Sequence, residues 1–208
     1  RHFGEHLSFL SSVRGAPLFQ TKTGPVLTTV GKHGEESLRI LNSLSQKGRE
    51  KVARLEEWAE RFGLKQLRGV WRGGDELTVT FLDPHSETEI DSIVFAGSGS
   101  KHVLPVLVAL ARADVGDTVL LDEPEVSLHP AWVLELASVL ISAASRGVQI
   151  ILATQVPTLV LALARALRSQ SLFRDLRIVE LSRNPDGSQA TVLELSPRGY
   201  LTSWPYSD

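Results

Sequence analysis

Two adjacent carboxylates, Asp122 and Glu123, directly follow the apolar run 118–121. Such a run predicts a buried strand, and ligands of open α/β sheets bind beyond the C-terminal ends of the strands. A carboxylate placed there can hold Mg²⁺ through water, and the next one can accept a proton from a water that attacks a phosphate. The alternative interpretation is a solvated acidic turn, because short acidic motifs often match by accident.

Further polar residues lie before and after this pair, at the starts of expected helices and at the end of a second expected strand. A Gly/Ser segment, 97–101, opens a helix, and a helix N-terminus binds phosphate through its N–H groups. Its glycines alternatively serve only to permit a positive φ. Gln155 follows a second buried run; a Gln can orient water but cannot carry a proton, and alternatively it is a solvated strand end. His129 precedes a helix, where a lone His is commonly a cap.

These residues need an alternating arrangement of strands and helices to position them. Strands are expected at 118–121 and 148–153 with a helix over 130–145 between them, which predicts a parallel crossover. Helices are expected from 34 to 62, broken at Gly48, and at 102–113 and 158–168, with Pro105 in a first turn. A strand pair, 77–82 and 88–95, and a hairpin, 176–181 with 190–195, complete the pattern, and residues 1–33 are interpreted as a structured loop region.

Composition narrows the class of protein. The 208 residues are 42% hydrophobic and 22% charged, as in an ordinary globular protein, and the net charge of -2 gives no overall attraction to nucleic acid. The absence of Cys excludes disulfides and thiolate sites, and no apolar run reaches the ~18 residues of a membrane helix. We therefore expect a cytoplasmic protein that does not enter a membrane. Because the chain starts at Arg1 and lacks Met, we expect a fragment or a processed chain.

The order of these features resembles that of ABC-type ATPases: signature motif at 97–101, Walker B at 118–123, D-loop at 127–130 and switch residue at Gln155. The resemblance covers about 93–163 well and the start of the chain more weakly. The phrase 122–130 is similar to that of the SMC/RecF-like and OLD-like AAA ATPases of prokaryotes, as are 103–107, 30–35 and the closing Trp204-Pro205.

This resemblance implies an α/β fold, a P-loop NTPase core with a parallel sheet, flanking helices and antiparallel hairpins. It divides the chain into a lobe at 1–92 and a C-terminal core at 93–208. It implies an ATPase that binds ATP and Mg²⁺ at the interface of a homodimer or head-to-head heterodimer, with possible DNA contacts and a role in DNA repair, DNA maintenance or phage defence. Asp122 would hold the metal, and Glu123 and Gln155 would be catalytic. The nucleotide contacts would come from Gly97, Ser98, Gly99, Ser100, Lys101, Ser127 and His129.

The sequence departs from this pattern in three places. There is no Walker A motif, since Lys101 is followed by His102 and not by the Ser or Thr that a phosphate loop needs. We therefore expect the Walker A segment before Arg1 or on a separate chain. Ser100 or Lys101 stands where the family has its signature Ser, and Gln155 stands where it usually has a His. These departures leave open a second hypothesis, a hydrolysis-deficient interaction or dimerisation module. A third, an ABC transporter subunit, is disfavoured by Glu125 and His129 and by the lack of a membrane-coupling segment.

Overall fold

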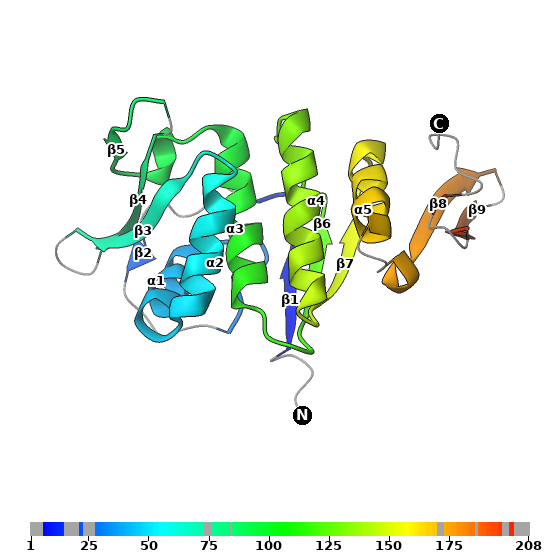
Figure 1. The fold of residues 1–208 in the computed structure, drawn as a ribbon, viewed down its shortest axis with the longest axis horizontal. Helices are drawn as coiled ribbons and strands as arrows, with labels where there is room; N and C mark the ends of the chain where they lie inside the picture. Colours follow the sequence, from blue (N-terminus) through cyan, green and yellow to red (C-terminus); the bar gives the residue numbers. More distant parts are fainter. Residues whose placement is uncertain are drawn as a thin grey trace. The chain divides into compact units, whose positions relative to one another are not determined.

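Three parallel strands form the sheet that leads into residues 122–129, called the acidic turn. The computed structural model describes residues 6–14, 21–22, 28–72, 76–83, 85–169, 173–185, 187–196 and 200–201. In it, β1 (Leu7–Leu10), β6 (Thr118–Asp122) and β7 (Gln149–Ala153) lie side by side in the order β1-β6-β7 (Figure 1). Both pairs are parallel, and the pair β6–β7 confirms the predicted crossover. The α/β fold class is thereby confirmed.

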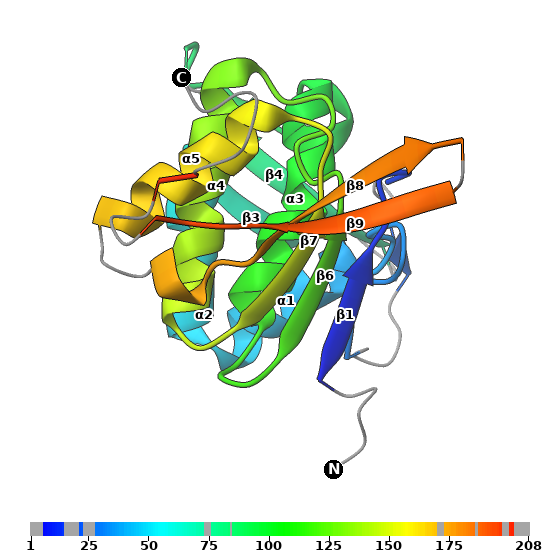
Figure 2. The same cartoon turned by 90° about the vertical axis from the view of Figure 1, so that its right-hand side faces the viewer.

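Two helices cover one face of this sheet. α3 (Ser98–Arg112) and α4 (Pro130–Ser145) contact the strands, and in Figure 2 they lie behind them. The strand residues on this face, Leu10, Val119 and Leu121, are almost fully buried. α4 spans the predicted residues because Pro130 occupies its first position, where a missing N–H costs nothing. The sheet and its helices thus bring the C-terminal end of β6 to a defined edge.

A second, antiparallel sheet packs beside the helices. β2 (Thr21–Lys22), β4 (Glu76–Leu82) and β3 (Lys65–Trp71) pair in that order, and β5 (Glu89–Ile90) also pairs with β4. α1 (Ser37–Lys47) and α2 (Arg49–Glu60) lie between β3 and α3 (Figure 1). Their separation at Gly48 confirms the predicted break.

Three details of the predicted elements were wrong. The region 1–33 contains strands β1 and β2, and β3 was not predicted at all. The return strand expected over 88–95 is only the two residues of β5, followed by a 3-10 turn, η2 (Ile93–Phe95). β1 escaped detection because polar Ser8 is one of its buried residues, so the strand lacks hydrophobic alternation.

The Gly/Ser segment and Pro105 also lie differently from the prediction. α3 begins at Ser98, so the supposed loop 98–101 is the first turn of the helix, with Gly97 as its N-cap. Pro105 is consequently inside the helix and not in its first turn. There it is buried, and Gly34 approaches so closely that a Cβ at that glycine would lie 2.6 Å from the proline ring. At this position proline cannot donate the hydrogen bond that other residues make within a helix.

The chain separates into two compact units, 1–155 and 156–208. The second contains α5 (Pro157–Ser169), η3 (Phe173–Asp175), β8 (Ile178–Asn184) and β9 (Gly187–Leu193). β8 and β9 pair along their full length, which confirms the predicted hairpin. Its small core is centred on Ala164, Leu193 and Leu201. The predicted boundary at residues 92 and 93 stays a prediction; β1, which precedes it, pairs with β6, which follows it.

Within the described residues, no helix is both long and apolar enough to cross a membrane. The closing Trp204-Pro205, part of the sequence resemblance, lies outside the described residues.

Candidate functional site

Asp122, Glu123 and Gln155 meet at the C-terminal edge of the parallel sheet. Asp122 is the last residue of β6 and lies opposite Ala153, the last residue of β7. The amide of Glu123 donates to the carbonyl of Ala153 at 2.9 Å, which extends the pairing by one residue. The side-chain amide of Gln155 donates to Oε1 of Glu123 at 2.5 Å. Two carboxylates and an amide from neighbouring strand ends thus lie at one edge, and their predicted roles stay predictions.

The backbone of the acidic turn is strained at two residues. Glu123 has a φ of 43° and Ser127 a φ of 66°, in the left-handed region that side chains other than Gly rarely adopt. Such a conformation costs on the order of 1–3 kcal/mol and persists only where the surroundings impose it. The turn is closed by two further bonds, from Val126 N to Glu123 O at 3.1 Å and from Leu128 N to Glu125 O at 3.0 Å.

His129 ends the turn as the N-cap of α4. Its Nδ1 accepts the amide hydrogen of Ala131 at 3.2 Å, and its φ and ψ of -63° and 144° are extended. This is the capping role left open by the sequence, and it uses one ring nitrogen. The ring is otherwise exposed, so the predicted contact across a dimer stays a prediction.

Glu125 is a buried acid that anchors the turn. Only 6% of it is exposed, and Thr154 donates its hydroxyl hydrogen to Oε1. The other oxygen, Oε2, is buried without a hydrogen-bond partner among the described residues. Neither this pair nor its role was predicted from the sequence, although Glu125 was noted as part of the motif.

The N-terminus of α3 packs against the same turn. A Cβ at Gly99 would lie 2.9 Å from the carbonyl oxygen of Ser127 and 3.1 Å from the ring of Trp132, so only glycine fits without displacement. Ser100 is buried and donates to the carbonyl of Phe62 at 2.8 Å. Gly97 and Ser98 are exposed, and Lys101 is half-buried. The predicted signature segment therefore presents its first residues to solvent and turns Ser100 inward.

Arg14 is a functional candidate that sequence reasoning missed. It is 3% exposed, and its guanidinium donates to three carbonyls: Ser11 and Asp122 at 3.2 Å from Nη1, and Glu123 at 2.9 Å from Nη2. Two residues earlier, the amide of Ser12 donates to Oδ2 of Asp122 at 3.2 Å. The segment after β1 thus binds both the backbone and the side chain of the acidic turn. No periodicity marks it, and a single charged residue in a loop gives no signal of burial.

Charges of the acidic turn act on Arg14, and the charge of Arg14 in turn acts on His102 of α3. Burial lowers the pKa of Arg14, and the charges of Glu125, Asp122 and Glu123 act in the opposite direction. Burial also lowers the pKa of His102 on α3, and the positive charges of Arg14 and Lys101 lower it further. Nδ1 of His102 and Nε of Arg14 are buried without hydrogen-bond partners in the described part of the chain. His102 is thus favoured in its neutral form near pH 7.

The carboxylates of this turn are of the chemical type that Mg²⁺ binds. Among the described residues, no three His, Asp or Glu side chains converge as a metal site would require. Mg²⁺ typically uses one or two carboxylates together with substrate phosphates, and Asp122 is placed to be such a ligand. Gly97, the N-cap of α3, has no side chain that could cap the first N–H groups of the helix, and such N–H groups can bind an anion.

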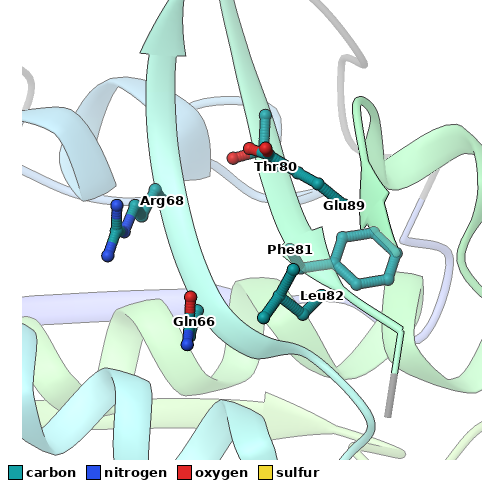
Figure 3. Close-up of a pocket in the computed structure, with 6 residues that line it drawn as sticks. All are labelled: Gln66, Arg68, Thr80, Phe81, Leu82 and Glu89. Atoms are coloured by element: carbon teal, nitrogen blue, oxygen red, sulfur yellow. The ribbon is translucent and has the colours of Figure 1, made fainter. Parts of the chain in front are cut away.

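A hollow on the antiparallel sheet lies apart from this edge. Figure 3 shows its lining of polar and apolar side chains from β3, β4 and β5. They are Gln66, Arg68, Thr80, Phe81, Leu82 and Glu89. None of these residues belongs to the acidic turn or to α3, so the hollow is not part of the candidate site.

Comparison with solved structures supports the fold. One similar structure, from work on "ATP-driven dimerization and DNA stimulated activation of SMC ATPases", has a TM-score of 0.53 and 18% identity and covers 74% of this chain and 89% of its own. An SMC head bound to the C-terminal winged-helix domain of ScpA has a TM-score of 0.56 and 15% identity, and covers 76% and 49%. An SMC head with a coiled coil from Pyrococcus yayanosii has a TM-score of 0.53 and 17% identity, and covers 74% and 28%. The chain thus spans about half or less of the latter two. No curated protein is significantly similar in sequence.

The sequence also matches a protein family directly. Residues 19–162, more than half of the chain, match the family described as "AAA domain, putative AbiEii toxin, Type IV TA system". The match includes α3, the acidic turn and Gln155. Together with the parallel sheet and the likeness to SMC heads, it confirms the resemblance to SMC/RecF-like ABC-type ATPases. The chain is a member of this AAA domain family and has the fold of an SMC-like ATPase head.

Proposed function

We propose that this chain is part of an ATP-hydrolysing head that binds ATP and Mg²⁺ between two protomers. The observation that carries the proposal is the meeting of Asp122, Glu123 and Gln155 at one sheet edge, with Glu123 held from both the backbone and the side chain. A solvated acidic turn, the alternative interpretation, needs neither the strained φ of Glu123 nor the amide of Gln155.

Each residue of the turn has a role in this proposal. Asp122 binds the metal ion, and Glu123 accepts a proton from the attacking water. Gln155 orients the carboxylate of Glu123 through the hydrogen bond already present and senses the phosphate. Bound Mg²⁺ would offset the negative charge of the phosphates.

The predicted contacts across the dimer come from α3 and from the D-loop. Gly97 and Ser98 are exposed at the N-terminus of α3, where N–H groups can bind a phosphate held by a partner, and half-buried Lys101 lies in the same turn. Ser127 packs against Gly99, so a movement of one is transmitted to the other. Ser100 supports this helix end from within by its bond to Phe62. One of the similar SMC structures is described as dimerising under ATP and as stimulated by DNA; we extend both properties to this chain as part of the proposal.

A segment outside these 208 residues would supply the phosphate loop. The sequence contains no Gly-x-x-x-x-Gly-Lys-Ser/Thr. Parallel sheets are normally covered on both faces. Within the unit 1–155, however, the row formed by Phe9, Leu120 and Ile151 faces away from α3 and α4, and Phe9 and Ile151 are 41% and 54% exposed. This apolar row supports a further helix on that face, carried by the Walker A segment.

A hydrolysis-deficient dimerisation module is the second candidate. The observation that favours it is Gln155, since an amide can hold Glu123 but cannot carry a proton as a switch His does. The two candidates differ in turnover, and both bind nucleotide.

The test is ATP hydrolysis by the complete gene product while Mg²⁺ is titrated, for the wild type and for Asp122→Asn. Mg²⁺-dependent turnover, and an Asp122→Asn form that needs at least about tenfold more Mg²⁺ or loses activity, support the ATPase. Nucleotide binding without turnover supports the module. Neither binding nor turnover overturns both. Turnover in the presence and absence of duplex DNA tests the proposed coupling to DNA.

A further inference from the structure

The buried guanidinium of Arg14 donates hydrogen bonds to the acidic turn, and the proposed function gives it no role. It lies in the segment after β1, more than 100 residues from the acidic turn in sequence, and is 3% exposed. Burying a charge is costly unless its donors are used. Here the donors go to the backbone of Asp122 and Glu123 and to the neighbouring Ser11.

We propose that Arg14 is a positioning residue of the acidic turn. Its guanidinium holds the carbonyls of Asp122 and Glu123 and thereby keeps the Glu123 carboxylate in the orientation that accepts a proton from water. The inference rests on the proposed ATPase function and deepens it. Arg14 acts through Glu123 and does not itself touch a reacting atom.

The first argument is the conformation that Arg14 imposes. Glu123 is in the left-handed region, with a φ of 43°, where a residue with a Cβ stays only if its neighbours hold it. The two peptide groups that flank its Cα point their carbonyl oxygens at the guanidinium, at 3.2 Å for Asp122 and 2.9 Å for Glu123. Rotation of Glu123 to an ordinary φ would separate these two oxygens and break the paired contact.

The second argument is where the guanidinium does not bind. Among the described residues, Arg14 forms no ion pair within 4 Å of a carboxylate, although the charges of Glu125, Asp122 and Glu123 all act on it. Arginine ordinarily binds carboxylates through two parallel hydrogen bonds, which would occupy the oxygens. Because Arg14 binds main-chain carbonyls instead, it orients the turn while leaving the carboxylate of Glu123 to Gln155 and to water.

The third argument is the requirement for arginine. Its planar fork reaches two successive carbonyls at once, whereas the ammonium of lysine is a point donor on a flexible stem. Lysine at position 14 keeps the positive charge but not the paired contact. The inference therefore separates charge from geometry, and the conservative substitution tests it.

The same protein provides a matched control. Arg146 donates to the carbonyls of Leu110 and Ala113, at 2.9 Å and 3.4 Å, near the C-terminus of α3. It is a partly buried arginine, and its Nε, like that of Arg14, has no hydrogen-bond partner in the described structure. It binds no residue of the acidic turn, so Arg146→Lys removes an equivalent structural contact at a distance from the chemistry.

The experiment compares Arg14→Lys, Arg14→Gln and Arg146→Lys with the wild type in the complete gene product. It measures kcat and KM for ATP, the thermal midpoint, and hydrogen exchange of the amides of Val126 and Leu128, which close the turn. For both Arg14 variants we expect kcat to fall by at least about tenfold, with KM changed by less than about threefold and exchange of the turn amides at least about tenfold faster. For Arg146→Lys we expect kcat within about twofold of the wild type, whatever its thermal midpoint.

The outcomes separate this inference from the function on which it rests. A wild type without turnover overturns the proposed ATPase and the inference with it. An active wild type whose soluble Arg14 variant keeps its kcat and its slow turn exchange overturns only the role of Arg14. If kcat falls and KM changes in both the Arg14 and the Arg146 variants in proportion to the fall of the thermal midpoint, Arg14 is merely structural and the inference is also wrong.

Discussion

The contact between the first turn of α3 and the acidic turn decides whether replacing Gly99 by alanine stabilises or destabilises the protein. Gly99 is the second residue of a 15-residue helix, so helix propensity alone favours alanine by about 0.5–1 kcal/mol. The structure predicts the opposite, because the added methyl carbon would lie 2.9 Å from the carbonyl oxygen of Ser127 and 3.1 Å from the ring of Trp132. We predict that Gly99→Ala destabilises the protein.

The size of the effect follows from what can move. The Ser127 oxygen belongs to a backbone with a φ of 66°, and the Trp132 ring packs edge-on against Phe62 with the centroids 5.7 Å apart. Neither is the free end of a flexible side chain, so relief requires a shift of backbone or of a packed ring. Overpacking of this kind costs about 1–3 kcal/mol. With the propensity gain subtracted, the expected loss is about 0–2.5 kcal/mol of unfolding free energy.

Urea unfolding, followed by far-UV circular dichroism, measures this difference. Gly69→Ala in β3 is the control, since its Cβ would meet only atoms at 3.7 Å or more and a strand tolerates Ala better than Gly. We expect that variant to be equal to the wild type or more stable. If Gly99→Ala proves more stable than the wild type, by the amount that propensity supplies, the close approach of α3 to the turn is refuted.

Three further predictions follow from the site and its surroundings. Gln155→Ala removes a hydrogen bond to a charged Glu123, worth about 1.5–3 kcal/mol, so kcat should fall by about 10–100-fold with KM for ATP little changed; an unchanged kcat would show that this bond is idle in turnover. His129→Ala removes the N-cap of α4 and should lower the unfolding free energy by about 1 kcal/mol in urea, and a loss below about 0.3 kcal/mol would argue against the cap. Burial acts to raise the pKa of Asp117, but hydrogen bonds, one of them with His6, outweigh it and hold that pKa below its ordinary value. A folded-state pKa below the unfolded one means stability that is present above about pH 4 and lost as the pH falls through the folded-state pKa. The stability difference between the wild type and Asp117→Asn should therefore shrink below about pH 4 in urea titrations at several pH values, and a constant difference would contradict the pKa assignment.

The fold of the central region could be predicted because local signals agree there. The apolar runs 118–121 and 148–153, the Pro130 helix start and the Gly48 break each follow from short-range chemistry, and all were confirmed. β1 and β3 could not be predicted in this way. β1 is four residues long and buries Ser8, and β3 has two successive half-buried residues, Gly69 and Val70, which interrupt its alternation. β1 pairs with β6, more than 100 residues further along the chain, so a tertiary contact and not a local pattern defines it, whereas β3 pairs with the next strand, β4.

In the candidate site, too, some residues follow from the local sequence pattern and others depend on distant contacts. The positions of Asp122, Glu123 and Gln155 could be inferred because strand ends of a parallel crossover meet at one edge. The inward turn of Ser100 was hidden, since it depends on α3 beginning at Ser98 and on the distant carbonyl of Phe62. Arg14 was hidden for a similar reason, because nothing in its neighbours indicates that it is buried against β6.

The central claim is that Glu123 performs the chemistry of an ATP site, and one measurement tests it most directly. Equilibrium binding of ATP and single-turnover hydrolysis are compared for the wild type and Glu123→Gln in the complete gene product, with Glu135→Gln on α4 as the matched control. The amide keeps the shape of the side chain but cannot accept the proton. We predict that Glu123→Gln binds ATP within about threefold of the wild type and hydrolyses it at least about 100-fold more slowly, while Glu135→Gln matches the wild type. Hydrolysis by Glu123→Gln at the wild-type rate would contradict the account.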